Sequence, residues 1–233
     1  MDIERMNRLL ELIDKANEYT RLYDLGTPAI TDQEWDNIYF EIEKLENELN
    51  IYPQNSPTRS IPYEVVNALK KVEHNHKMLS LQKTKDLNEV KSFIENKPSL
   101  AMCKMDGLTC SLTYVDGYLT AAETRGNGII GEDILHNVLH LKSVPRHLLG
   151  LRGKVVIDGE IICTLTDFEM FALDYKNPRN FAAGSIRLLD SKECAQRKLT
   201  FVAWDVIEGF DHLELLSKKL DRLKREHFIV VPY

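Results

Sequence analysis

Residues 177–190 read N-P-R-N-F-A-A-G-S-I-R-L-L-D. The small side chains at 182–185 allow another segment or a ligand to come close to the backbone. Arg179 and Arg187 are eight residues apart, so a helix in this stretch places them near one face. Two guanidinium groups beside a surface of small residues suit phosphate recognition. The alternative is tight helix packing with both arginines solvated.

Upstream of this stretch, residues 157–162 read I-D-G-E-I-I. A carboxylate inside an otherwise apolar strand is costly unless it is paired or bound to a cation. Glu160 is therefore a candidate to hold a ribose hydroxyl or, directly or through water, a magnesium ion. It is the one metal ligand that we consider. The alternative is an acid at the edge of a strand, facing solvent.

A glycine-rich stretch precedes that strand: residues 124–133 read T-R-G-N-G-I-I-G-E-D. Three glycines in six residues predict a loop with close backbone approach, and we expect a helix to open near Gly131. Free backbone N–H groups and a helix N-terminus can hold a phosphate. Arg125 suits a phosphate or a ribose edge. The alternative is an ordinary glycine-rich turn.

Residues 104–107, K-M-D-G, place a lysine at the end of a predicted strand. A lysine is protonated at neutral pH, with a pKa of about 10.4, and is then not nucleophilic. It becomes a covalent nucleophile where burial or neighbouring cations remove the proton. Gly107 allows a tight turn beside a bulky substrate. Taken alone, the tetrapeptide also fits a surface hairpin.

Together and in this order, the four motifs closely resemble the adenylation domain of NAD-dependent DNA ligases, from about residue 5 to the end of the chain. The resemblance implies that Lys104 attacks NAD to form lysyl-AMP and that Asp106 is the second catalytic residue. The AMP then passes to the 5′-phosphate of a nick in double-stranded DNA, and the 3′-hydroxyl displaces it. Magnesium (Mg2+) and arginines stabilise the phosphoryl charge. The implied adenosine contacts are Ser80, Leu81, Arg125 and Glu160. The implied phosphate or DNA contacts are Arg179, Arg187 and Arg197.

The first fifty residues predict a helical hairpin. Apolar residues recur at helical spacing over 3–20, and Thr31 opens a second helix as the N-cap of a capping box with Glu34. The resemblance implies that this hairpin binds the nicotinamide mononucleotide half of NAD, and aromatic faces suit a cationic ring. The alternative makes Trp35 a core residue and the nearby acids helix N-terminal charges. The residues implied in nicotinamide binding are Tyr23, Asp32, Gln33, Glu34, Trp35 and Asp36.

The pattern as a whole predicts an α+β fold. We expect a helical subdomain over residues 1–60 and a nucleotidyltransferase domain with a largely antiparallel sheet over 61–233. Asp116-Gly117 is typical of a hairpin turn between two strands. The predicted strands cover residues 101–104, 109–114, 119–124, 155–162 and 199–206. The predicted helices of the second domain lie near residues 86–96, 131–139, 166–174 and 213–226.

Composition narrows the class of protein. The chain has 233 residues, of which 43% are hydrophobic, as in ordinary soluble domains. No apolar run approaches the roughly 20 residues that span a membrane, and the N-terminus lacks a signal-peptide pattern. We therefore expect a cytoplasmic protein without membrane contact. The four cysteines form no C-x-x-C pair, so we expect reduced thiols and no zinc knuckle. Cys103 is expected to be buried in a strand.

The charge is uneven along the chain. Residues 1–50 carry 13 acidic and 5 basic side chains, whereas residues 51–233 carry 23 and 25. The hairpin is therefore a poor candidate for contact with DNA phosphates. The remainder permits such contact.

The chain ends at Tyr233, before the D-G-V-V-I-K segment and the last lysine motif that the family has in this domain. We therefore expect a fragment or one subunit of a split ligase, completed by a second ligase chain and unable to seal nicks alone. Some matched positions depart from the family. Met102 replaces a glutamate that reads adenine, Asp158 replaces an arginine, Asn127 replaces an aspartate, and Gln82-Lys83 replaces a smaller pair.

Two other functions remain open from the sequence. An ATP-dependent nucleotidyltransferase shares K-x-D-G, although the nicotinamide-type hairpin argues against it. A ligase-like subunit that only binds a nucleotide or a partner would not need Lys104 at all.

Overall fold

A computed structural model describes residues 3–24, 29–59, 69–79, 81–171 and 175–233. The described residues contain two separate hydrophobic cores, one between the two N-terminal helices and one around a five-stranded sheet. The α+β class is confirmed. The predicted boundary between residues 60 and 61 falls in a stretch that lies outside the described residues. No helix in the described ranges is long and apolar enough to cross a membrane.

The N-terminal hairpin consists of α1 (Ile3–Asp24) and α2 (Asp32–Leu49). Its core is formed by the apolar face of each helix, with Leu9, Ile13 and Ile42 fully buried. The predicted capping box is confirmed, because the Thr31 side chain accepts from the N–H of Glu34 and the Glu34 carboxylate accepts from the N–H of Thr31. The hairpin projects from the rest of the chain, and its first helix contacts α6.

The main sheet has the strand order β3-β2-β5-β6-β7. Its first four strands are antiparallel, and β7 pairs parallel to β6. Asp116 and Gly117 form the expected two-residue turn between β2 and β3, both with positive φ (49° and 87°), as a primed turn requires. The strands are β2 (Leu108–Val115), β3 (Tyr118–Thr124), β5 (Lys154–Ile162), β6 (Thr200–Glu208) and β7 (Ile229–Val230).

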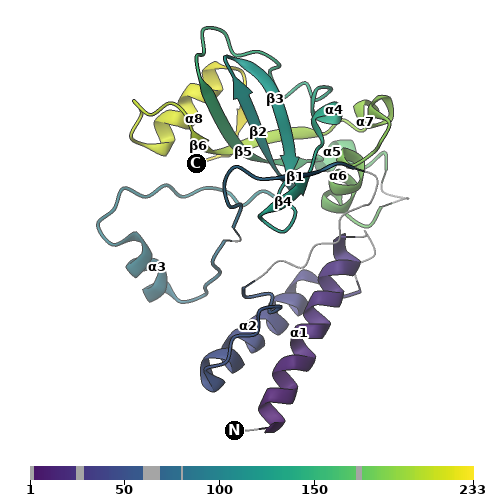
Figure 1. Cartoon of the computed structure of the whole chain (residues 1–233), viewed down its shortest axis with the longest axis vertical. Helices are drawn as coiled ribbons and strands as arrows, with labels where there is room; N and C mark the ends of the chain where they lie inside the picture. Colours follow the sequence, from purple (N-terminus) through teal and green to yellow (C-terminus); the bar gives the residue numbers. More distant parts are fainter. Residues whose placement is uncertain (1–2, 25–28, 60–68, 80, 172–174) are drawn as a thin grey trace.

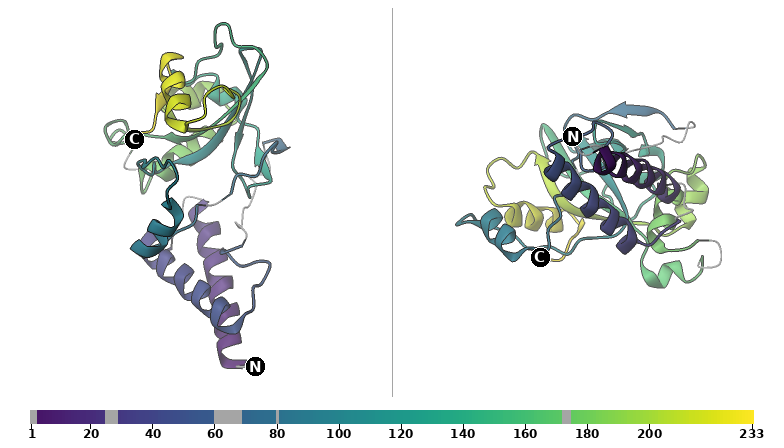
Figure 2. Two further views of the ribbon diagram at one scale, coloured as in Figure 1. Left: turned by 90° about the vertical axis from the view of Figure 1, so that its left-hand side faces the viewer. Right: turned by 90° about the horizontal axis from the view of Figure 1, so that it is seen from below.

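Helices cover this sheet (Figures 1 and 2). The helix α8 packs against β6 and β7, and α6 packs against β2 and β5. A second, two-stranded sheet joins β1 to β4. The remaining elements are β1 (Lys71–Glu73), α3 (Leu87–Ile94), β4 (Ile130–Glu132), α4 (Leu135–Val138), α5 (Leu165–Phe168), α6 (Pro178–Ile186), α7 (Ser191–Gln196) and α8 (Leu216–Arg225).

Three local predictions differ from the structure, one in whole and two in their bounds. Residues 101–104 form no strand, and Cys103 is exposed, its N–H donating to the carbonyl of Pro232 (3.2 Å). Gly131 itself pairs with Val72 in the two-stranded sheet, so the helix expected near residues 131–139 begins only at Leu135, as α4. The helix expected near residues 166–174 ends at Phe168, and 172–174 lie outside the described residues. The sequence misled at these places because a short apolar run alone does not distinguish a strand from a loop. The strand at Gly131 forms by pairing with β1, which is distant in the sequence.

Candidate functional site

Lys104 lies on an irregular segment that leads directly into β2, and its side chain is exposed. Gly107 fixes where this segment meets the sheet. A Cβ atom at Gly107 would stand 2.2 Å from the carbonyl oxygen of Ile161, so only glycine allows this approach of β2 to β5. The K-M-D-G motif is therefore a close backbone crossing at the edge of the core, with its lysine on the open side.

Glu160 lies on β5 opposite Thr109 of β2, whose hydroxyl donates to its carboxylate (3.1 Å). Burial raises the pKa of Glu160, and the hydrogen bond from Thr109 opposes that shift. Three positive charges also lower this pKa, in the order Arg179, Lys104 and Arg125. The lysine segment, the glycine loop and α6 therefore each supply one cation whose charge acts on the same carboxylate. Glu160 is a half-buried residue of a central strand, so the alternative of a solvent-facing edge acid is wrong.

Arg179 stands in the first turn of α6. Asn177 caps this helix by accepting from the N–H of Asn180 (2.8 Å), and Pro178 occupies the first turn, where its missing N–H costs nothing. The Arg179 guanidinium lies 3.4 Å from the Asp106 carboxylate. This contact joins α6 to the K-M-D-G motif, two residues after the lysine.

The glycine-rich stretch forms a tight turn between β3 and β4. A Cβ atom at Gly126 would stand 1.9 Å from the carbonyl oxygen of Ile130, and Gly128 has a φ of 88°. The Asn127 side chain accepts from the N–H groups of Ile129 (3.0 Å) and Ile130 (2.8 Å). The backbone groups of this loop are thus largely used to hold the turn itself.

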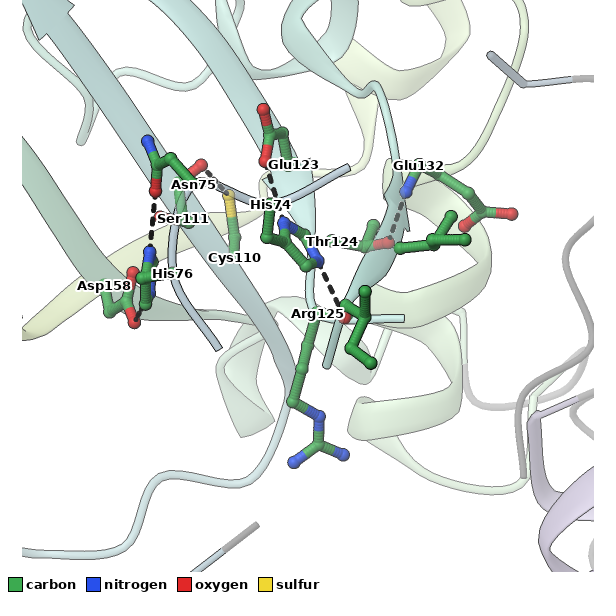
Figure 3. Close-up of polar contacts among 12 residues, drawn as sticks. His74, Asn75, His76, Cys110, Ser111, Glu123, Thr124, Arg125, Glu132 and Asp158 are labelled. Atoms are coloured by element: carbon green, nitrogen blue, oxygen red, sulfur yellow. Dashed lines mark hydrogen bonds and ion pairs between the residues drawn. The ribbon is translucent and has the colours of Figure 1, made fainter. Parts of the chain in front are cut away.

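A buried histidine beneath the glycine loop was not foreseen from the sequence. His74 contacts the Glu123 carboxylate through Nδ1 (2.8 Å) and the Arg125 carbonyl through Nε2 (2.9 Å), while the Arg125 guanidinium points away from this pair (Figure 3). Both contacted groups are acceptors, so both ring nitrogens must donate, which requires the imidazolium form.

The charge state of His74 follows from its partners. Burial lowers the pKa of His74, but the hydrogen bonds to Glu123 and to the Arg125 carbonyl, with the charges of Glu123 and Asp158, outweigh burial and leave the pKa raised. His74 thus fixes the backbone from which Arg125 extends. A second histidine contact nearby joins His76 Nε2 to Asp158 (3.0 Å).

All three predicted phosphate arginines have acidic partners inside the protein, Arg179 through the contact with Asp106 described above. Arg187 donates to the Glu132 carboxylate (2.8 Å), and the two side chains are 9% and 0% exposed. Arg179 and Arg187 therefore point to different partners, contrary to the expectation that they form one phosphate-binding pair. Arg197 lies over the ring of Phe171, 5.4 Å from its centroid, and pairs with Glu193 (2.6 Å).

On the hairpin, Trp35 and Tyr39 stack with ring centroids 5.4 Å apart and an interplanar angle of 28°. The Trp35 indole N–H donates to the Thr20 hydroxyl (3.2 Å). Trp35 is half-buried, so it is not an interior core residue. The ammonium of Lys83 forms an ion pair with Asp36 and stands 4.7 Å from the Trp35 ring centroid.

The remaining predicted contacts have varied surroundings. Gln33 and Glu34 are exposed on the first turn of α2, and Glu34 is occupied by the capping box. Leu81 is exposed. Ser80 lies outside the described residues, as do the side chains of Tyr23 and Asp32.

The donor set at Glu160 bears on the predicted magnesium ion. Among the described residues, no group of three or more histidine, cysteine or acidic side chains gathers as a metal site. Magnesium is often held by one or two carboxylates together with substrate phosphates and water. Glu160 fits such a role as a single carboxylate, and substrate phosphates would supply the other ligands.

Comparison with known proteins gives consistent matches. The family model described as "NAD-dependent DNA ligase adenylation domain" matches residues 66–233. A DNA ligase of Lachnoclostridium phytofermentans is 36% identical over 238 residues, covering 98% of this chain and 36% of the relative. DNA ligases of Ruminiclostridium cellulolyticum (32%) and Mycoplasma genitalium (33%) each align with 99% of this chain and with 36% and 37% of their own length. The chain thus spans about a third of the length of these relatives.

Proposed function

Because the chain belongs to the family of the NAD-dependent DNA ligase adenylation domain, we propose that it forms lysyl-AMP from NAD on Lys104 and serves the sealing of nicks in DNA. The observation that carries this proposal is that three cations, Lys104, Arg125 and Arg179, all lie near enough to Glu160 to lower its pKa. Four motifs that are separate in the sequence supply these residues. A nucleotidyl transfer needs a nucleophile, phosphate-binding cations and an acceptor for the nucleoside, and this cluster contains each kind of group.

In the proposed reaction, the neutral amine of Lys104 attacks the α-phosphorus of NAD. A nitrogen–phosphorus bond forms, and the bond to the bridging oxygen breaks. The electron pair leaves with nicotinamide mononucleotide, and the nitrogen releases one proton to solvent. Arg179 and Arg125 are assigned to bind the phosphoryl oxygens, where charge develops.

Glu160 is assigned to the nucleoside. Glu160 is a half-buried carboxylate on a central strand. It can therefore accept a hydrogen bond from a ribose hydroxyl in a better-defined position than a mobile surface acid can. Asp106 positions the Arg179 guanidinium through their contact. When bound, magnesium would neutralise phosphate charge, with Glu160 as its protein ligand.

The helical hairpin is assigned to the nicotinamide half of NAD. The stacked rings of Trp35 and Tyr39 and the carboxylate of Asp36 combine aromatic faces with negative charge. Such a combination favours a cationic ring. Tyr23, Asp32 and Gln33 belong to this assignment by their positions in the sequence.

The roles of the other arginines are revised in this proposal. Arg187 acts by holding the glycine loop through Glu132, since the pair is buried. Arg197 acts by packing over the rings of Phe171 and Phe181, the second of which lies in α6. Both are positioning residues, which leaves Arg179 and Arg125 as the direct phosphate ligands.

We also propose that a second ligase chain or segment completes the active protein, since this chain spans about a third of its relatives. The substrate is nicked double-stranded DNA with a 5′-phosphate and a 3′-hydroxyl. The four free cysteines agree with the reducing cytoplasm as the compartment.

Nick sealing tests this proposal. The chain is mixed with the remaining segment of the Lachnoclostridium phytofermentans ligase and a nicked duplex, with NAD or ATP as the nucleotide. We expect sealing with NAD, none with ATP, and none with the Lys104→Ala variant, whereas Lys142→Ala, an exposed lysine on another loop, seals normally. Sealing with ATP would indicate the ATP-dependent alternative. Sealing by Lys104→Ala would indicate a subunit that does not carry the chemistry.

A further inference from the structure

One contact between the hairpin and the segment before α3 involves a lysine. Lys83 extends from the segment before α3 to the surface of α2. Its ammonium stands 4.7 Å from the ring centroid of Trp35 and 5.4 Å from that of Tyr39, and it pairs with the Asp36 carboxylate. Three groups from two turns of one helix thus converge on a single cation.

The three groups form a box for a cation. The two rings stack at 28°, so their faces are held in a fixed relation, and the bond from the Trp35 indole to Thr20 fixes one of them. Aromatic faces attract cations through their quadrupoles, and the carboxylate adds a full negative charge. A positively charged ring of a ligand would use the same faces and the same carboxylate.

We propose that Lys83 is an internal competitor for the nicotinamide site: its ammonium occupies the place of the cationic ring and must leave before that ring binds. This inference rests on the proposed function, which assigns the nicotinamide half of NAD to these residues. Lys83 thereby lowers the affinity of the chain for the nicotinamide half. Lys83 stands where the family that this chain resembles has a smaller residue. The competition is therefore a feature of this chain and is not required by the reaction itself.

The contact is of a kind that a ligand can displace. The side chains of Lys83 and Asp36 are 40% and 39% exposed, and an exposed ion pair contributes little to stability. Removing the ion pair and the ring contacts together should therefore raise the affinity for the nicotinamide half only modestly, roughly three- to tenfold.

The chain provides a matched control. Lys85 comes from the same segment and stands 5.1 Å from the ring centroid of Phe40, one turn along α2 from Asp36. Replacing Lys85 by methionine removes the same charge from the same segment at a position outside the cation box. Lys83→Arg keeps a cation in place.

The experiment titrates nicotinamide mononucleotide into the full chain by isothermal calorimetry, for the wild type, Lys83→Met, Lys83→Arg and Lys85→Met. We expect Lys83→Met to lower the Kd roughly three- to tenfold, because the ligand no longer displaces a cation. The Kd values of Lys83→Arg and Lys85→Met should stay within about twofold of the wild type.

The outcomes separate this inference from the proposed function. If the wild type binds the mononucleotide and Lys83→Met binds it equally or more weakly, the competition is refuted. Weaker binding by Lys83→Met, that is, a higher Kd, would make Lys83 a ligand for the phosphate of the mononucleotide. If no variant binds the mononucleotide, the competition and the assignment of the hairpin fall together. An equal gain for Lys83→Met and Lys85→Met would show a general charge effect and overturn the inference.

Discussion

The guanidinium of Arg187 donates to the carboxylate of Glu132 at 2.8 Å inside the α+β domain. Glu132 is fully buried and Arg187 nearly so. The contact joins the C-terminal end of α6 to β4, directly after the glycine loop. It therefore connects the two segments that carry Arg179 and Arg125, and its integrity decides how these two arginines stand relative to one another.

Removing one partner of this buried pair should be costly. Arg187→Ala removes the buried cation that faces Glu132, and we expect a loss of about 3–5 kcal/mol in the free energy of unfolding. The matched control is Lys154→Ala, which breaks an exposed pair with Glu208 and should cost under about 1 kcal/mol. Urea unfolding measures both. Equal, small losses for the two variants would show that the buried pair does not hold the loop.

Two glycine substitutions should have opposite effects. In Gly107→Ala the new Cβ atom meets the Ile161 carbonyl at 2.2 Å, so β2 must move away from β5. We expect a loss of about 2 kcal/mol or more from overpacking, together with a displaced Lys104. In Gly184→Ala the nearest atom, on Tyr175, is 3.8 Å away, and alanine in a helix gains about 0.5–1 kcal/mol. Thermal melts of both variants check this, and a stable Gly107→Ala would contradict the close crossing.

The charged carboxylate of Glu160 should lower the stability of the folded protein, although the proposed reaction needs it. Its pKa is raised by burial above the usual value, so the charged form is disfavoured in the folded state. The resulting penalty is fully present above the raised pKa and disappears as the pH falls below about 4.5. Glu160→Gln should therefore raise the Tm at pH 7.5 by a few degrees (about 2–4 °C per kcal/mol for a chain of this size).

The same variant should lose adenylation, because the proposed acceptor for the ribose has lost its charge. The gain in Tm over the wild type should shrink at acidic pH. A Glu160→Gln variant that is less stable than the wild type at pH 7.5 would show that the carboxylate is stabilised in place, contrary to the burial argument.

Because of His74, the free energy of unfolding should fall as the pH rises. Its folded pKa is raised above 6.5, so the stability from its two hydrogen bonds is fully present below pH 6.5 and declines as the pH rises through the folded value. We expect the free energy of unfolding to fall between pH 6 and pH 9, and the fall to be smaller in His74→Gln. His212→Gln, at an exposed histidine, should keep the pH dependence of the wild type. Identical pH profiles for all three proteins would refute the imidazolium assignment.

The sequence predicted the regular elements because their signals are local. The capping box at Thr31, the Asp116-Gly117 turn and the apolar runs of β2, β3, β5 and β6 each depend on neighbouring residues. The main candidate residues, Lys104, Arg125, Glu160 and Arg179, were proposed from short, distinctive motifs, and their roles stay predictions. The structure adds that the three cations among them all act to lower the pKa of Glu160.

The remaining features depend on contacts between distant segments. The strand at Gly131 exists because β1, some sixty residues earlier, pairs with it. Arg187 was expected to face phosphate, but Glu132, 55 residues away in the sequence, binds it in the interior. No local pattern distinguishes such an arginine from a phosphate ligand. The contacts of His74 with Glu123 and of Lys83 with Asp36 were missed for the same reason.

The central claim is that AMP becomes attached to Lys104. The direct measurement is mass spectrometry of the chain after incubation with NAD labelled in the adenine and magnesium, alone and with the remaining ligase segment of a relative, followed by mapping of the labelled peptide. We predict one AMP on Lys104 in the completed protein, weak or no labelling of the chain alone, and none in Lys104→Arg. Labelling of another residue, or no AMP adduct in the completed protein, would contradict the account.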